Sequence, residues 1–139
     1  MKKITLTIVS QEKQLLKTQV DQVSVPTTQG EVTILPNHIP LFSKLAEGEL
    51  TYKDGADSQL FFVMGGFLSV SAESEVTVIA DAASLARDIS IQKAQEAVEQ
   101  AKTTIATSTD RRELLMAEAS LRRALLEIRI AQKTKRSSI

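Results

Sequence analysis

The sequence contains no cysteine, no tryptophan and only one histidine among its 139 residues. The absence of cysteine excludes a disulfide scaffold, a cysteine-ligated zinc site and a thiol nucleophile. The single histidine, His38, excludes metal sites built from several imidazoles. No apolar run approaches the roughly 18 residues that a membrane-spanning helix requires. With 42% apolar and 24% charged residues, the composition is that of an ordinary globular protein.

Glycine, proline and aromatic residues are all confined to the first 67 positions. Residues 1–86 carry six lysines, no arginine and ten acidic residues, a net charge of −4. Residues 87–139 carry seven arginines, four lysines and seven acidic residues, a net charge of +4. We therefore predict two domains, 1–86 and 87–139, of which the basic one meets a charged partner.

The first domain is predicted to be a β-sandwich or barrel, because short β-rich runs alternate with turn residues. The expected strands are residues 4–8, 20–25, 32–35, 50–53, 60–64, 67–71 and 76–80. The pair Gly65-Gly66 is expected to connect two strands tightly. Asp54-Gly55 is a good hairpin signal, although the loop predicted there is longer than two residues.

The second domain is predicted to be two antiparallel helices joined by the polar segment 107–110. Ser90 is the expected N-cap of the first helix, and Asp110 with Glu113 restarts the second. Apolar residues recur at helical spacing along one stripe of each helix. The stripes consist of Ile91, Ala94, Val98, Ala101 and Ile105, and of Leu114, Ala117, Leu121, Ala124, Leu125 and Ile128. Because alanine buries little area, this hairpin is expected to pack weakly.

No pattern of residues predicts an enzyme. His38 lies between two prolines, with no nucleophile or orienting carboxylate beside it. Gly65-Gly66 lacks the lysine that completes a phosphate-binding loop. Asp81 and Asp88 have no spacing that suits a metal or paired-carboxylate site. We therefore expect neither catalytic residues nor a metal.

Cations on the second predicted helix follow a pattern and recur beside the apolar stripe. They are Arg111, Arg122, Arg129 and Lys133. An ordinary solvated face accounts for the pattern equally well. Nucleic-acid binding is a weaker interpretation, because the chain is neutral overall and this domain has no aromatic residues for stacking. An acidic protein surface fits at least as well.

The chain resembles the ε subunit of F-type ATP synthases over essentially its full length. Three segments carry this resemblance, and they occur in the same order as in the family. Residues 30–41, GEVTILPNHIPL, resemble the family signature G-x-x-x-[IV]-x-P-x-H-[AI]-P-L, with Asn37 and Ile39 where glycine and alanine are common. Residues 64–70, MGGFLSV, resemble its following strand, and residues 76–83, VTVIADAA, its last strand. The resemblance implies a flattened ten-stranded β-sandwich followed by a two-helix hairpin.

The resemblance also implies a non-catalytic rotor subunit, which couples proton or sodium flow to ATP synthesis. Its partners would be the γ subunit, the c-ring, and the catalytic β and non-catalytic α subunits, without nucleic acid. It would meet the membrane only through the complex, at the cytoplasmic face of a bacterial inner membrane or the stromal side of a thylakoid. The alternative is a stand-alone β-sandwich module whose basic helices bind nucleic acid or an acidic protein.

By the same resemblance, the c-ring contacts would be Glu31, His38, Ile39, Pro40 and Leu41. The helical hairpin would be regulatory, resisting ATP hydrolysis when it extends towards the catalytic subunits. Its cations would face an acidic segment of the β subunits. These cations are Arg111, Arg112, Arg122, Arg123 and Arg129.

Some family members bind ATP through an [IL]-D-x-x-R-A motif at the start of the first helix. Here the matching residues are Ile89, Ser90, Lys93 and Ala94, so serine replaces aspartate and lysine replaces arginine. Lysine lacks the guanidinium fork that binds phosphate in a bidentate manner, although Arg123 could still contact phosphates. We expect no cofactor, and weak or absent binding of regulatory ATP.

Overall fold

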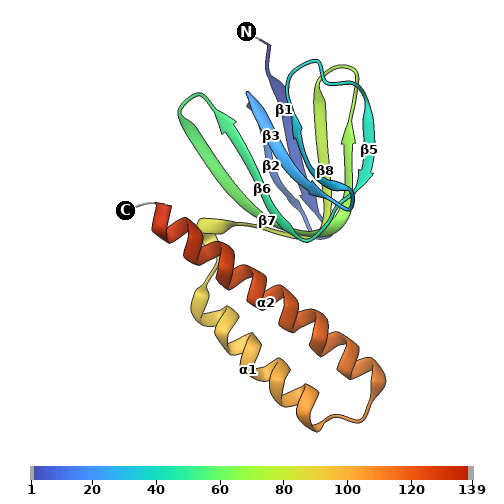
Figure 1. The fold of residues 1–139 in the computed structure, drawn as a ribbon, viewed down its shortest axis with the longest axis vertical. Helices are drawn as coiled ribbons and strands as arrows, with labels where there is room; N and C mark the ends of the chain where they lie inside the picture. Colours follow the sequence, from blue (N-terminus) through green and yellow to red (C-terminus); the bar gives the residue numbers. More distant parts are fainter. Residues whose placement is uncertain (1, 138–139) are drawn as a thin grey trace. The chain divides into compact units, whose positions relative to one another are not determined.

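The computed structural model describes residues 2–137, and the chain divides into two compact units between Leu85 and Ala86. The first unit contains eight strands, and the second contains a short 3-10 helix, η1, and two α-helices (Figure 1). The strands are β1 (Ile4–Ser10), β2 (Gln14–Val20), β3 (Gln22–Thr27), β4 (Gly30–Ile34), β5 (Leu41–Lys44), β6 (Gly48–Asp54), β7 (Asp57–Val70) and β8 (Glu75–Leu85). The helices are η1 (Ala86–Asp88), α1 (Ile91–Thr107) and α2 (Arg111–Ser137).

The strands form one sheet that folds over itself. They are hydrogen-bonded in the order β2-β1-β8-β7-β6-β3-β4, and β5 pairs with β7 outside this path. The first half of β7 pairs with β6 and the second half with β5, while only the first half of β8 pairs with β1. Two long strands therefore run through both layers of the sandwich.

The core lies between these layers because alternate residues of each strand point inwards. Ile4, Leu6 and Ile8 of β1 are fully buried, and they belong to the same apolar cluster as Val23 and Val25 of β3. The predicted β-sandwich followed by two helices is thus confirmed. The structure has eight strands rather than ten, because β7 and β8 each contribute a segment to both layers without interruption.

Gly65 and Gly66 lie where β7 passes from one layer to the other. Their φ angles are +66° and +104°, in a region that side-chain-bearing residues rarely adopt. A Cβ atom on Gly66 would lie 2.8 Å from Cα of Ala80 and closer still to the carbonyl oxygen of Ile79. The predicted connection between two strands is therefore wrong, since the glycines bend one strand where the backbone of β8 lies against it.

Other predicted boundaries also differ from those in the structure. The run 20–25 is divided between β2 and β3, and neither residues 14–19 of β2 nor β5 were predicted as strands. The hairpin between β6 and β7 has a two-residue loop, because Asp54 pairs with Asp57. Gly55 supplies the positive φ of +61° that such a tight turn uses.

The helical unit matches the predicted hairpin. Ser90 caps α1, its Oγ accepting a hydrogen bond from the backbone N–H of Lys93 at 3.2 Å. Asp110 caps α2, its Oδ1 accepting from the N–H of Arg112 at 3.1 Å. Both are confirmed as the expected helix starts.

The two helices pack through few large side chains. Ala94, Val98 and Ala124 form the buried cluster between them, with Leu121 and Ile128 partly buried against it. Leu125 was predicted to join this stripe but is 50% exposed. At 100° per residue it lies about 60° from the centre of the stripe, which is far enough to turn it to solvent.

Candidate interaction surfaces

The loop of residues 35–40, which joins β4 to β5, begins with a tight turn. The backbone N–H of His38 donates to the carbonyl oxygen of Leu35 at 3.1 Å. Pro36 and Asn37 occupy the two central positions, and the φ of Asn37 is +69°. Proline followed by a residue of positive φ is the pattern of a type II turn, in which asparagine is the second choice after glycine.

Two contacts from other parts of the sandwich hold Asn37. Its backbone N–H donates to Oγ of Ser74 at 2.9 Å, and its Oδ1 accepts from Nζ of Lys2 at 2.6 Å. Nδ1 of His38 lies 2.6 Å from the carbonyl oxygen of Ile39. The histidine ring is therefore held by its own loop.

This loop exposes apolar side chains. Leu35 is 54% exposed and Ile39 is 75% exposed. Exposed apolar surface next to ordered backbone is typical of a protein-binding site. The structure thus places His38, Ile39 and Pro40 together on one surface.

Glu31 is exposed but lies at the other end of β4, beside the turn that joins β3 to β4. Thr28 in that turn donates its N–H to Lys44 at the end of β5, whereas Leu41 starts β5 beside Val70. At about 3.3 Å per residue, Glu31 and Leu35 are separated by about 13 Å along the strand. The predicted ring contacts therefore form two separate places on the sandwich.

An apolar patch that the sequence patterns did not predict lies on the outer side of the sheet. We call Phe42, Phe67 and Ile79 the outer patch; they are 70%, 45% and 51% exposed. The rings of Phe42 and Phe67 stack with centroids 5.4 Å apart, and Phe67 is directly opposite Ile79 on the neighbouring strand. Three strands assemble this patch, and each contributes one residue whose side chain points away from the core.

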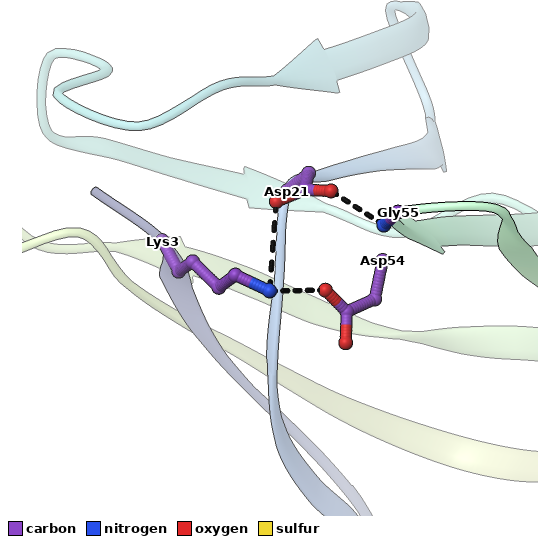
Figure 2. A network of polar contacts seen from close by, with 4 residues as sticks. All are labelled: Lys3, Asp21, Asp54 and Gly55. Atoms are coloured by element: carbon purple, nitrogen blue, oxygen red, sulfur yellow. Dashed lines mark hydrogen bonds and ion pairs between the residues drawn. The ribbon is translucent and has the colours of Figure 1, made fainter. Parts of the chain in front are cut away.

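Figure 2 shows a polar network beside the chain's N-terminal strand. Lys3 contacts Asp54 closely and lies 3.8 Å from Oδ1 of Asp21, whose Oδ2 accepts from the N–H of Gly55 at 2.6 Å. The hydrogen bond with Asp54 is the main cause that raises the pKa of Lys3 above 10.5. The network links the start of β1 to the β6–β7 hairpin, and it has no nucleophile that could make it a catalytic site.

The predicted cationic residues of α2 are all exposed. They are Arg111, Arg112, Arg122, Arg123 and Arg129. Arg123 lies 3.6 Å from Glu127 one turn later. Burial raises the pKa of Glu127, and the charge of Arg123 lowers it to a smaller extent. The helix therefore presents several exposed cations, and Arg123 among them lies beside an acid.

The residues at the degenerate ATP motif serve the helix itself. The Ser90 hydroxyl caps α1 by accepting from the N–H of Lys93, and the Lys93 side chain is exposed.

Among the residues that the structure describes, no group of three or more His, Cys, Asp or Glu side chains could hold a metal ion. Within the same residues, no helix combines the length and the apolar character needed to cross a membrane.

Comparison with known proteins identifies the family. Residues 3–86 match the family model described as the β-sandwich domain of the ATP synthase delta/epsilon chain. The ATP synthase epsilon chain of Syntrophobacter fumaroxidans is 41% identical over 132 residues, covering 95% of this chain and 98% of that one. The epsilon chain of Dehalococcoides mccartyi is 39% identical over 137 residues, covering 98% and 97%.

Solved structures share the fold. A chain of the Euglena gracilis mitochondrial ATP synthase matches with a TM-score of 0.71 at 24% identity, over 96% of this chain and 81% of that one. A chain of the Tetrahymena thermophila ATP synthase central stalk and c-ring matches with a TM-score of 0.63 at 14% identity, over 94% and 97%. Since the family model spans more than half of the chain and the curated relatives span nearly all of it, this chain belongs to the family of ATP synthase epsilon chains.

Proposed function

We propose that this chain is a non-catalytic rotor subunit, which carries rotation from the c-ring to the γ subunit during ATP synthesis. The observation that carries the proposal is apolar surface exposed on an ordered sandwich, at the outer patch and at Ile39. A subunit that transmits force needs broad contacts on a stiff body rather than a reactive cleft. Family membership favours this role over a stand-alone binding module.

The outer patch is the surface we assign to the γ subunit, and the two ends of β4 are those we assign to the c-ring. Burying one phenylalanine contributes about 1.5–3 kcal/mol, which corresponds to a tenfold or larger change in affinity. Phe42→Ser is therefore expected to weaken binding to the purified γ–c-ring subcomplex at least tenfold. Lys17→Ser is the matched control, because it is exposed on the outer side of β2 in the same layer.

Unchanged affinity of the Phe42→Ser variant would remove the outer patch from the interface. Glu31→Gln and Ile39→Ser test the two ring contacts independently, because Glu31 lies near the start of β4 and Ile39 in the loop that follows its end. In the assembled complex, the chain would lie on the cytoplasmic face of a bacterial inner membrane, or on the stromal side of a thylakoid, and touch the membrane only through its partners.

We further propose that the helical hairpin restrains ATP hydrolysis, with the exposed cations of α2 facing an acidic segment of the catalytic β subunits. The core between its helices is small and is centred on Ala94, Val98 and Ala124. This supports a hairpin whose folded state and whose state extended towards the catalytic subunits differ little in free energy. Because exposed ion pairs contribute about 0–1 kcal/mol each, several must act together.

The test is a combined charge reversal, Arg111→Glu, Arg122→Glu and Arg129→Glu, in the reassembled complex. ATP hydrolysis is expected to rise while ATP synthesis stays constant. Lys102→Glu is the control, since it is an exposed cation on α1. Equal hydrolysis by both variants would refute an electrostatic restraint.

The hairpin is proposed to bind regulatory ATP weakly or not at all. Ser90 brings no carboxylate, Lys93 brings no guanidinium fork, and Arg123 is paired with Glu127. Calorimetric titration of the isolated chain with ATP is expected to show weak or no binding. A dissociation constant in the low micromolar range would overturn this proposal.

A further inference from the structure

Two residues in the described part of the chain combine a side chain with a positive φ, and they are bound to each other. These residues are Asn37, at +69°, and Ser74, at +59°. They are 37 positions apart, and the N–H of Asn37 donates to Oγ of Ser74 at 2.9 Å. Each such backbone conformation costs about 1–3 kcal/mol and persists only where its surroundings hold it in place.

Ser74 is fixed independently of the loop that it contacts. It is 5% exposed, its carbonyl oxygen accepts from the N–H of Thr5 at 3.0 Å, and its own N–H donates to Ser71. The first bond ties it to β1 and the second to the turn between β7 and β8. Ser74 is therefore a rigid point, and its hydroxyl extends from that point to the loop.

Asn37 is the residue whose conformation sets the direction of the loop. It occupies the third position of the type II turn, and Ile39, two residues later, is 75% exposed. If Asn37 left the left-handed region, the turn would open and Ile39 would point elsewhere. An apolar side chain that must stay in water before binding gains affinity from being held in its bound direction.

We propose that Ser74 is a positioning residue, which pre-organises the 35–40 loop for its contact with the rest of the rotor. This inference rests on the proposed function, in which the loop touches the c-ring. Ser74 does not itself touch the partner, because it is buried. It acts by raising the fraction of molecules whose loop is already in the binding conformation.

Ser74→Ala isolates the hydroxyl, because alanine has the same backbone cost at this φ. Ser71→Ala is the matched control: its Oγ accepts only from within the turn, from the N–H groups of Glu73 and Glu75, both at 3.3 Å. Losing one hydrogen bond is expected to lower the equilibrium constant between the ordered and the open loop about fivefold. The affinity for the γ–c-ring subcomplex should fall in proportion to the ordered fraction, by at most the same factor.

Two readouts separate positioning from general stability. Amide hydrogen exchange in the isolated full-length chain should accelerate at Asn37 and His38 in Ser74→Ala but not in Ser71→Ala. The urea midpoints of the two variants should remain similar to each other. Equal exchange at Asn37 in the two variants would overturn the proposal directly.

Ile39→Ser distinguishes this inference from the proposed function. If Ile39→Ser and Ser74→Ala both weaken binding, positioning is supported. If Ile39→Ser weakens binding and Ser74→Ala does not, the loop is a contact but Ser74 does not position it. If Ile39→Ser binds as the unaltered chain does, the loop contact itself is wrong and the positioning role is overturned with it.

Discussion

Gly66→Ala is expected to destabilise the sandwich more than the replacement of any of the other four glycines by alanine. The first cost is conformational: a φ of +104° costs a side-chain-bearing residue about 1–3 kcal/mol. The second cost is steric, since the new Cβ would overlap the backbone of β8 at Ile79 and Ala80. Relieving such an overlap by moving backbone costs about 1–3 kcal/mol more, which gives a total of about 2–6 kcal/mol.

Gly30→Ala is the matched control, because Gly30 has a similar φ of +114° but a Cβ atom there would meet nothing within 4 Å. It should lose only the conformational part, so the difference between the two variants measures the contact with β8. Unfolding in urea can be followed by the fluorescence of Tyr52, which is the only tyrosine and packs against the sandwich core. With a slope of about 2 kcal/mol per molar urea, Gly66→Ala should lower the midpoint by about 1–3 M.

Equal destabilisation by the two alanines would refute the reasoning. It would mean that the backbone conformation alone matters at the bend, and that β8 moves aside without cost. A changed slope, rather than a changed midpoint, would point instead to a different unfolded or native ensemble.

Three further predictions concern charges and a cap. Because the pKa of Lys3 is raised, its network stabilises the fold below pH 10.5 and loses this effect as the pH rises through the raised pKa. In Lys3→Met, the melting temperature should therefore fall less between neutral and alkaline pH than in the unaltered chain. Burial raises the pKa of Glu127, so the helices should lose stability as the pH rises from 4.5 through the raised pKa. In Glu127→Gln, the melting temperature measured by circular dichroism should not fall over this pH range. Ser90→Ala should cost about 1 kcal/mol of α1 stability in the same melts, and an unchanged melting temperature would contradict its role as a cap.

Periodic segments were predictable from sequence because each is decided locally. Alternation over residues 4–8 predicted β1, and helical spacing with Ser90 and Asp110 predicted both helix starts. The strand β2 was missed because its sequence, QLLKTQV, is not alternating, and only pairing with β1 makes it a strand. The glycine pair at 65–66 indicates a break when only its neighbours in sequence are considered, whereas the structure uses it to bend a strand that continues.

The candidate surfaces likewise differ in whether their residues are adjacent in sequence or brought together only by the fold. The loop around His38 could be found because its prolines and histidine are adjacent in sequence. The outer patch could not, because Phe42, Phe67 and Ile79 come from three strands and meet only through register. The bond between Asn37 and Ser74 spans 37 positions, and each partner by itself indicates no more than a turn.

The parallel pairing of β1 with β8 has a consequence for synthesis of the chain. Thr5 pairs with Glu75 and Ser10 with Ala80, so each residue of the first strand stays without this neighbour until 70 more residues have been made. Assembly is slow because the entropy cost of closing so long a loop comes before the stabilising contacts form. Until β8 pairs with it, β1 exposes an unpaired edge. The helical hairpin consists of local contacts and emerges after β8, when the sandwich already has all eight of its described strands. A ribosome-bound chain ending near residue 70 is therefore expected to be sensitive to protease, and one that has released β8 to be resistant.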